Sequence, residues 1–322
     1  MELFAPMPLA EWADTKETLH RFAQIVGKVR LAASVRRNHW WNVPFYVTGR
    51  GLTTRPMGQA GGQVFTIDFD FAAHRLVVSA LDGREVSFPL AGQSVASFYQ
   101  RTSDALRALG VTAPIARPSP FDLPDAGRPF AGDTEHAAYD PAWVTRYWQV
   151  LTQVSLVLEQ FAAGYSGKIS PVHHFWHTFD IAVTRFSGRP ADQPADADPV
   201  TREAYSAEVS SAGFWFGDAT VPGPAFYSYT APVPAGLAAE PLQPPQAQWA
   251  ERGGSHLALF RYADARRAPD PRAAVLAFYE SAYQAGARLA GWDTGALGCP
   301  GGVTDPSCAP PFSDVDKVPG MA

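Results

Sequence analysis

The sequence has little cysteine, no long hydrophobic run and no excess of basic residues. Only two of the 322 residues are cysteines, Cys299 and Cys308, so a disulfide framework does not hold the fold and no CxxC metal-binding motif is present. The sequence leaves open whether these two pair with each other. No stretch approaches the roughly 18 apolar residues that a membrane helix requires, and the first twenty residues lack the basic-then-apolar order of a secretory signal. We expect a cytoplasmic protein that does not bind a membrane.

The net charge and the missing motifs exclude further classes of protein. Lys and Arg total 26 against 31 Asp and Glu, which gives a net charge of −5, whereas proteins that bind nucleic acid usually carry a basic excess or stripe. We therefore expect no nucleic-acid partner. The chain also lacks the GxGxxG, GxxxxGK[ST], GxSxG and HExxH motifs. Apolar residues are abundant: 46% hydrophobic and 12% aromatic residues suffice for one large core or two smaller ones.

Hydrophobic periodicity predicts a helix, a group of strands and a second helix in the first third of the chain. Residues 11–26 carry Trp12, Leu19 and Phe22 at helical spacing, and Gly27 stands where such a helix would end. Segments rich in Phe, Val and Ile then predict an antiparallel meander over residues 42–50, 64–71, 75–81 and 85–90. A second helix is predicted over residues 94–109.

The second half repeats this order after a proline-rich connector. Asp140 and Pro141 open a helix that is predicted to run to about residue 161, with Asp as N-cap and Pro in the first turn. Strands are predicted over residues 174–186, 207–216, 225–231 and 256–262, and a last helix over residues 271–290.

Short matches between the two halves indicate an internal duplication. They keep the same order in both halves: FAQIVGK (22–28) with FAAGYSGK (161–168), HWW (39–41) with HFW (174–176), Val47-Thr48 with Val183-Thr184, and SFYQ (97–100) with AFYE (277–280). We predict an α+β protein of two fused, internally duplicated helix/antiparallel-sheet/helix units. Residues 1–112 form the first half, 113–140 the connector, 141–293 the second half with the candidate site, and 294–322 a flexible tail. A pocket is expected where the halves meet.

Four motifs resemble those of a bacterial family known only as a domain of unknown function. They are HWWNVP (39–44), GRGLTT (49–54), SPVH (170–173) and AVTRFSGR (182–189). The resemblance runs from about Trp12 to Trp292 and implies a protein of about this length, but no activity. Two departures matter: the family has a histidine where this chain has Ala207, and a single histidine before its aromatic motif, where this chain has HHFWH (173–177). If the family histidine is a ligand or a base, this protein has lost it or has moved the role to His177.

The apparent duplication separates candidate functional residues from those that the fold explains more easily. His39 matches His174 and Trp41 matches Trp176, and buried histidines and tryptophans with satisfied polar atoms are common in cores and interfaces. Polar residues found in the second half alone are better candidates for function. They are His173, His177, Asp180, Tyr205 and Glu208.

A divalent metal site is one hypothesis for the histidine-rich segment. His173, His174 and His177 lie within five residues, and Glu208 or Asp180 would complete a His/carboxylate set. On a regular strand, however, side chains at i and i+4 are about 13 Å apart, and His174 points to the face opposite His173. The metal hypothesis therefore needs a turn near these histidines or ligands from other elements.

Acid–base chemistry without a metal is a second hypothesis. Glu208 follows Tyr205 closely and precedes an aromatic run at residues 214–216, so an apolar cleft would raise the pKa of its carboxyl, with a histidine from the segment His173 to His177 as the counterpart. The alternative is a glutamate at the end of a strand that pairs with an arginine at the surface.

Anion recognition is a third hypothesis. Arg185 and Arg189 lie four residues apart, and Arg50 and Arg55 occupy a related segment of the first half. Guanidinium groups bind carboxylate or phosphate with two hydrogen bonds, although salt bridges between the halves explain the same residues equally well. Trp176 and Trp215 would wall such a site, or would pack in the core.

These hypotheses combine into an expected function. We expect an enzyme that acts on a small, anionic organic molecule, held by Arg185 and Arg189, with His173, Tyr205 and Glu208 in proton transfer or His173 and Glu208 on a metal. The alternatives are a protein that binds a small ligand without catalysis, and a scaffold that uses its aromatic surface for a partner or for assembly into a homo-oligomer. Convergence of His173, Glu208 and an arginine in one cavity would favour the enzyme.

Overall fold

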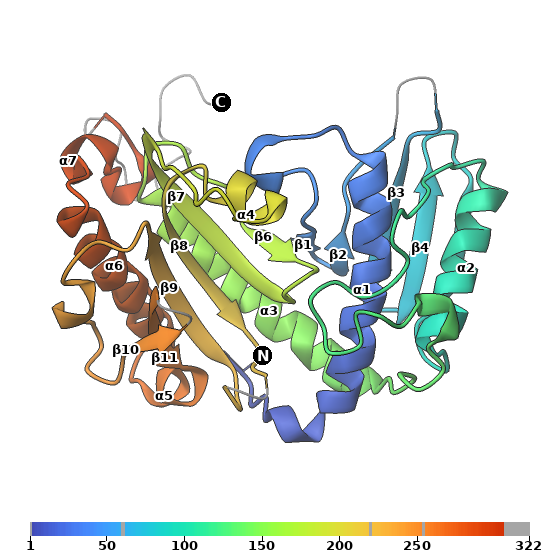
Figure 1. Ribbon diagram of the computed structural model, residues 1–322. Helices are drawn as coiled ribbons and strands as arrows, with labels where there is room; N and C mark the ends of the chain where they lie inside the picture. Colours follow the sequence, from blue (N-terminus) through green and yellow to red (C-terminus); the bar gives the residue numbers. More distant parts are fainter. Residues whose placement is uncertain (1, 59–61, 219–220, 253–254, 306–322) are drawn as a thin grey trace, which may run out of the picture.

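A computed structural model describes residues 2–58, 62–218, 221–252 and 255–305 (Figure 1). The described residues form seven α-helices and two antiparallel sheets, one of five strands and one of six. The predicted α+β class is confirmed. Among the described helices, none combines the length and the apolar character needed to cross a membrane.

The first half is a helix, an antiparallel meander and a helix, as predicted, but the meander has five strands where the sequence predicted four. Its strands pair in sequence order, β1 to β5. The bounds are α1 (Ala13–Ala33), β1 (Tyr46–Thr48), β2 (Gly51–Thr53), β3 (Phe65–Asp70), β4 (Arg75–Ala80), β5 (Glu85–Pro89) and α2 (Val95–Ala108), with short 3-10 helices η1 (Leu9–Glu11) and η2 (Asn38–Trp40).

Alternating side chains fix which face of this sheet is covered. Phe65, Ile67 and Phe69 of β3 are buried, while the residues between them are partly exposed, as expected for a strand with one face on the core. Phe98 of α2 stacks on Phe69 with ring centroids 6.3 Å apart, and on Phe22 of α1 at 4.0 Å. Helices α1 and α2 therefore pack together on the apolar face of the first sheet.

The second half begins with α3 (Pro141–Ala163), whose N-cap Asp140 accepts hydrogen bonds from two backbone N–H groups, as predicted. Its sheet has the order β10-β11-β9-β8-β7-β6. The remaining bounds are η3 (Phe130–Gly132), β6 (His173–Phe175), β7 (Asp180–Pro190), α4 (Pro199–Ala204), β8 (Ala207–Trp215), β9 (Ala225–Ala231), η4 (Leu237–Ala239), β10 (Gln248–Arg252), β11 (Ser255–Arg261), α5 (Tyr262–Arg267), α6 (Pro271–Leu289), α7 (Thr294–Leu297) and η5 (Pro300–Gly302).

A tight turn divides the strand predicted over residues 174–186. The chain leaves β6 after Phe175 and enters β7 at Asp180, and Phe179 in the turn has a left-handed backbone with φ 59°. The pairing sets His173 opposite Ala182 and His174 opposite Ile181. The turn thus leaves His173 and His174 in the short strand β6, where both side chains are buried.

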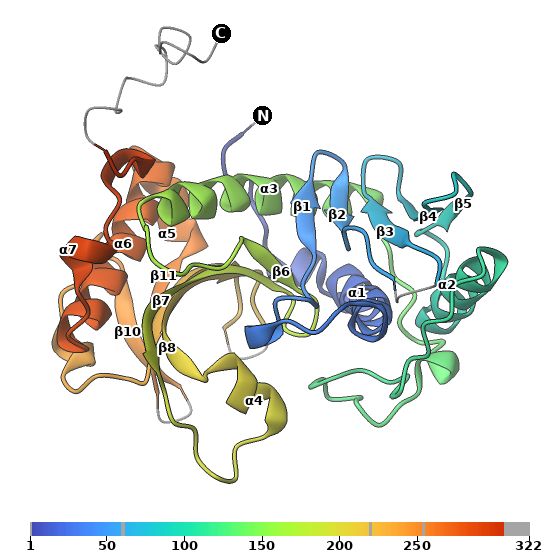
Figure 2. The same cartoon turned by 90° about the horizontal axis from the view of Figure 1, so that it is seen from above.

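The two sheets meet side by side at β1 and β6 (Figures 1 and 2). Phe45, just before β1, and His174 of β6 exchange two backbone hydrogen bonds of 2.9 Å. We call this contact the seam. Because opposed residues in antiparallel pairs share a face, Tyr46 lies on the same face as His173.

The two faces of the second sheet differ. The helix face carries Ile181, Phe214 and Phe226 and is covered by α3 and α6. The opposite face carries His173, Ala182 and Tyr227. Figure 2 shows that the sheet curves, with α3 and α6 on its convex side and α4 on its concave side; we call this second face the concave face.

The duplication is supported in part by the arrangement of elements. SFYQ lies in α2 and AFYE in α6, the helices that follow the two meanders. HWW lies in and after η2, before β1, whereas HFW lies in β6 and the turn after it. Common ancestry of the halves, and the domain limits drawn from it, stay predictions.

The C-terminal segment differs from the predicted flexible tail. Residues 294–305 form α7 and η5, the backbone N–H of Cys299 donates to the carbonyl of Gly164, and Cys299 is buried. Residues 306–322, with Cys308, lie outside the described residues, so the pairing of the two cysteines stays open.

Candidate functional site

The structure separates Glu208 from His173. Val209 pairs with Phe186 on the concave face, so the preceding Glu208 points toward the helix face, opposite to His173. Its carboxylate accepts hydrogen bonds of 2.8 Å from Ser187 and from Arg189, and Arg189 also reaches the carbonyl of Ala290 beyond α6. Glu208 therefore forms the alternative arrangement, a strand-end glutamate paired with an arginine, and does not meet His173.

The predicted anion-binding arginines are also engaged. Arg185 is buried on the helix face, with its guanidinium 3.6 Å above the ring of Phe161. It donates to the carbonyl of Phe161 at 2.5 Å and forms an ion pair of 3.3 Å with Glu280. Arg185 thus joins α3, α6 and β7, and with Arg189 paired to Glu208 neither arginine presents a free guanidinium to a ligand.

Trp176 and His174 likewise have structural partners. Trp176 donates to the carbonyl of Val43 at 3.1 Å, and its ring covers Gly27 of α1. Nε2 of His174 shares a hydrogen bond of 2.7 Å with the hydroxyl of Tyr147. Because His174 and His173 occupy opposite faces, the histidine segment does not assemble the predicted metal ligands.

Asp125, Asp133 and His136, in the connector, are the single group of possible metal ligands that lie close together among the described residues. Arg21 of α1 occupies this cluster: it donates to both carboxylate oxygens of Asp125, at 2.7 and 3.0 Å, and Asp133 accepts from His136 at 2.8 Å. We interpret the cluster as an ion-pair network that ties the connector to α1.

His173 lies instead in a cationic site at the seam. Its Nε2 is 3.3 Å from the hydroxyl of Tyr46, the residue opposite it on β1. The guanidinium of Arg55 stacks 3.4 Å from the centre of the Tyr46 ring, and that of Arg30, from α1, lies 5.8 Å away. Arg37 adds a third guanidinium, close enough to contribute to the lowered pKa of His173. We call these five residues the seam site: Arg30, Arg37, Tyr46, Arg55 and His173.

The seam site has positive charge without a counter-charge. None of its three arginines forms an ion pair with an acidic side chain anywhere in the part of the chain that the structure describes. Arg30 is only 6% exposed, and its Nε, like Nδ1 of His173, has no hydrogen-bond partner there. Burying a charge without a partner is costly.

The protonation states follow from burial. Burial lowers the pKa of Arg30 to about 10, so its guanidinium stays charged at neutral pH. Burial, followed by the three arginines, lowers the pKa of His173 to about 3. His173 is therefore a neutral imidazole beside cations, able to donate or accept one hydrogen bond at Nδ1.

A strained loop borders the seam site. His39 and Trp40 both have left-handed backbones, with φ 54° and 58°, a conformation that is costly for such residues and that often occurs at functional sites. Trp40 donates to the carbonyl of Val200 at 3.0 Å, and Lys168 lies 2.7 Å from Nε2 of His39. Contacts from the second half, including α4, thus hold a loop of the first half over the concave face.

Farther from the seam, the concave face carries hydroxyl and aromatic groups. The carboxylate of Asp180 accepts hydrogen bonds from Thr178 and Tyr227. Tyr205, a predicted site residue, donates to the hydroxyl of Tyr229 at 3.2 Å. Trp215 is half-buried, with its ring 5.3 Å from that of Tyr227 and no hydrogen-bond partner for its Nε1 among the described residues. Tyr205 and Trp215 therefore share a face with His173, while Glu208 does not.

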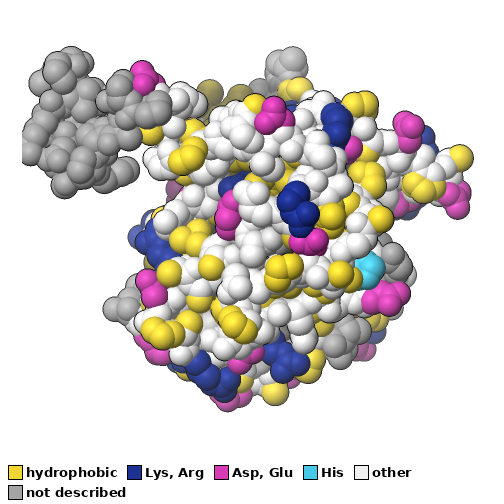
Figure 3. All heavy atoms as spheres, turned by 90° about the vertical axis from the view of Figure 1, so that its left-hand side faces the viewer, with side chains coloured by type: hydrophobic (Ala, Val, Ile, Leu, Met, Phe, Trp, Pro, Cys, Tyr) yellow, Lys and Arg dark blue, Asp and Glu magenta, His cyan; other side chains and the backbone are white. Residues whose placement is uncertain are grey.

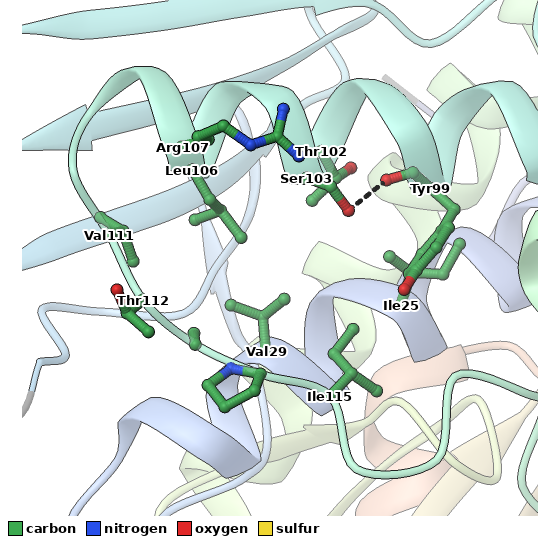
Figure 4. Close-up of a pocket in the computed structure, with 12 residues that line it drawn as sticks. Ile25, Val29, Tyr99, Thr102, Ser103, Leu106, Arg107, Val111, Thr112 and Ile115 are labelled. Carbon is green, nitrogen blue, oxygen red and sulfur yellow. Dashed lines mark hydrogen bonds between the residues drawn. The ribbon is translucent and has the colours of Figure 1, made fainter.

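Two hollows on the surface have the size of a small-ligand site. One, of about 630 Å³, lies at the edge of the concave face and includes Tyr205, Tyr229 and His256. The other, of about 290 Å³, lies between α1 and α2 and is mostly apolar (Figure 4). Arg107 is the charged side chain in its lining, and it pairs with Asp104 at 2.5 Å, so the lining presents no unpaired charge.

Comparison with known proteins identifies the family. The model of DUF5996, a family of unknown function, matches residues 4–299. The chain belongs to this family. No curated protein and no solved structure matched the chain. Membership of DUF5996 agrees with the resemblance seen in the sequence and assigns no activity.

Sequence reasoning missed most of the seam site. His173 was selected, and Arg55 was noted as part of a related segment, but Arg30, Arg37 and Tyr46 were not. Arg30 lies beyond Gly27, where the sequence predicts the first helix to end, and nothing in the spacing of the residues around it marks it as buried. The pairing of β1 with β6, which places Tyr46 beside His173, has no local signal.

Proposed function

We propose that this protein binds a small organic anion, a carboxylate or a phosphate, at the seam site. The observation that carries the proposal is Arg30, a buried guanidinium without an acidic partner among the described residues. Guanidinium groups match carboxylates and phosphates in charge and geometry. An anion between Arg30, Arg37 and Arg55 would offset their mutual repulsion, and the hydroxyl of Tyr46 and Nδ1 of His173 would supply further hydrogen bonds.

An enzyme that acts on this anion is a second candidate. Asp180 favours it, because its carboxyl lies on the same face as His173 and burial raises its pKa, a property common to general acids and bases. Asp180 would then take the role that the sequence suggested for Glu208. The residues of the predicted acid–base pair would change, while the anionic substrate class would stay.

The test compares ligand-induced stabilisation in two arginine variants. In wild type, inorganic phosphate or citrate should raise the Tm, since a ligand at 100 times its Kd adds about 2.7 kcal/mol. Arg30→Gln should abolish this rise without lowering the Tm of the free protein, because it removes an uncompensated buried charge. The measurement is a thermal-shift titration at low salt.

The control is Arg50→Gln, since Arg50 is exposed and already pairs with Asp70 at 2.7 Å; it should respond to anions as wild type does. Two outcomes contradict the proposal: Arg30→Gln stabilised by anions as much as wild type, or a wild type that no carboxylate or phosphate stabilises.

A further inference from the structure

The concave face also carries a carboxylate that lacks a cationic partner. Asp180 forms no ion pair with an arginine or lysine in the ranges that the structure describes. Its two oxygens accept hydrogen bonds from neutral hydroxyl groups, Oδ1 from Thr178 and Oδ2 from Tyr227. The imidazole that interacts with it, His177, also faces Asp122, and burial lowers the pKa of this histidine, so it is neutral at neutral pH.

The carboxylate and the seam site occupy neighbouring positions on the sheet. His173 lies opposite Ala182, and Asp180 is two residues along the same strand, on the same face. Diagonal neighbours of this kind have Cα atoms about 7–8 Å apart. Asp180 therefore lies beside His173, the residue that β6 contributes to the seam site, on one face of the sheet.

Small residues and one tyrosine shape the concave face between the seam site and Asp180. Ala182 and Gly213 are opposite each other in the row of His173. A Cβ on Gly213 would lie 2.4 Å from the ring of Tyr227, so the glycine lets this ring cross the sheet and aim its hydroxyl at Asp180. The position of the carboxylate is thus built by the packing of β7, β8 and β9.

The aromatic residues beside Asp180 suit an ammonium group. Phe175 and Trp215 are its direct neighbours on β6 and β8, and both are half-buried. Aromatic faces attract cations, and an ammonium group has three hydrogens that can be donated to carboxylate lone pairs. By contrast, a second anion here would be repelled by Asp180.

We propose that the ligand of the seam site is a zwitterion, with a carboxylate or phosphate on the arginines and an ammonium group on Asp180. This inference rests on the proposed function for its anionic end. No ion pair among the described residues neutralises either group of charges, and a ligand of this class would neutralise both. The chemical class is that of amino acids and amino phosphates whose two charged groups are separated by a short aliphatic chain.

The experiment measures binding of matched probes by isothermal titration calorimetry. The pairs are 6-aminohexanoate with hexanoate, and O-phosphoethanolamine with ethyl phosphate; the members of each pair share the anion and differ in the amine. We expect wild type to bind the amino member about tenfold more tightly, the effect of one charge-assisted hydrogen bond. Asp180→Asn should remove this preference and leave binding of hexanoate and ethyl phosphate unchanged.

Asp70→Asn, a change of a carboxylate on the first sheet that pairs with Arg50, is the matched control and should keep the preference. Equal affinity for both members of each pair in wild type overturns the inference and leaves the anion site standing; this comparison needs no variant to fold. A preference that survives Asp180→Asn also overturns it. Failure of all four probes and of inorganic phosphate to bind overturns the proposed function itself.

Discussion

Three buried histidines make this protein sensitive to acid at the level of single residues. Burial is the main cause that lowers the pKa of His20, His173 and His174 to about 3 each, from an ordinary value of 6.5. In the unfolded chain these imidazoles bind protons below about pH 6.5, whereas in the folded protein they stay neutral down to about pH 3. The stability linked to them is present above pH 6.5 and is lost as the pH falls from 6.5 toward 3.

We predict that His174→Gln makes the stability less dependent on pH. Glutamine still accepts a hydrogen bond from Tyr147 but does not titrate, so the loss of unfolding free energy below pH 6 should become smaller by up to about 1.4 kcal/mol per pH unit. Urea unfolding at pH 7, 6, 5 and 4.5 measures this slope. An unchanged slope would show that His174 is not neutral in the folded state.

The residue types in the sequence indicated which side chains are candidates for a functional site. The sequence did not indicate which residues these side chains contact. His173 was a candidate because of its type and because the first half lacks an equivalent. Its grouping with Arg30 and Tyr46, and the pairing of Glu208 with Arg189, depend on which face each side chain takes. The register of β1, β6, β7 and β8 decides which face of the sheet each side chain takes. A single sequence does not specify this register.

At the scale of elements, local signals predicted most helices and strands. Asp140 with Pro141 marked the start of α3, and β9 has the predicted bounds. Strands β2 and β10 and helices α4 and α5 were missed, because short elements carry little periodicity. Strands β6 and β7 were predicted as one, since the turn between them contains apolar residues in place of glycine or proline.

Gly27 shows how packing between elements overrides a local signal. The sequence predicted a helix end there, but α1 continues to Ala33. The glycine is needed because Trp176, after β6, rests on it: a Cβ would lie 2.2 Å from the indole ring. The residue that looked like a stop signal is therefore a contact between α1 and the second sheet.

We predict that Gly27→Ala destabilises the protein by about 1–3 kcal/mol, because the indole is buried and cannot move away, despite the gain of about 1 kcal/mol in helix propensity. Gly49→Ala is the matched control, since no atom lies within 4 Å of its added Cβ; it should change stability by less than about 0.5 kcal/mol. Equal effects of the two substitutions in chemical denaturation would contradict the close contact.

At the scale of the whole molecule, the two halves share one core. Buried side chains from both sheets and the main helices form a continuous apolar cluster. The N-terminal segment enters the second half, where Phe4 packs against Phe226 and Tyr262 with ring centroids 5.5 and 5.6 Å apart. At the seam, Phe45 stacks on His174. The halves are therefore two lobes packed around a shared core.

We predict a single unfolding transition for the full chain. Because each lobe buries side chains of the other, calorimetric and van't Hoff enthalpies should agree, and Phe4→Ala should shift the whole transition, by about 3–5 kcal/mol in unfolding free energy, without splitting it. Differential scanning calorimetry provides the measurement. Two separated transitions in wild type would show that the lobes fold independently.

On the side of the molecule shown in Figure 3, the surface has the mixed charged and hydrophobic composition of an ordinary protein surface. On the side shown in Figure 3, Lys and Arg alternate with Asp and Glu among scattered hydrophobic side chains. The large hydrophobic residues with the greatest exposure among those described, Val35 and Leu81, both belong to the first half. Single exposed apolar residues of this kind are normal, so the scaffold alternative gains no support from this side of the molecule.

The amino-acid sequence by itself determined the α+β class, the order of most elements and the family, because periodicity, capping residues and motifs are local properties of the chain. Tertiary structure alone decided the site. An arginine of α1, a tyrosine of β1 and a histidine of β6 come together through one backbone pairing across the seam, and strand register sends Glu208 and Arg185 away from it. Contacts between residues more than a hundred positions apart leave no local trace, so the charges that remain unpaired become visible only in the folded molecule.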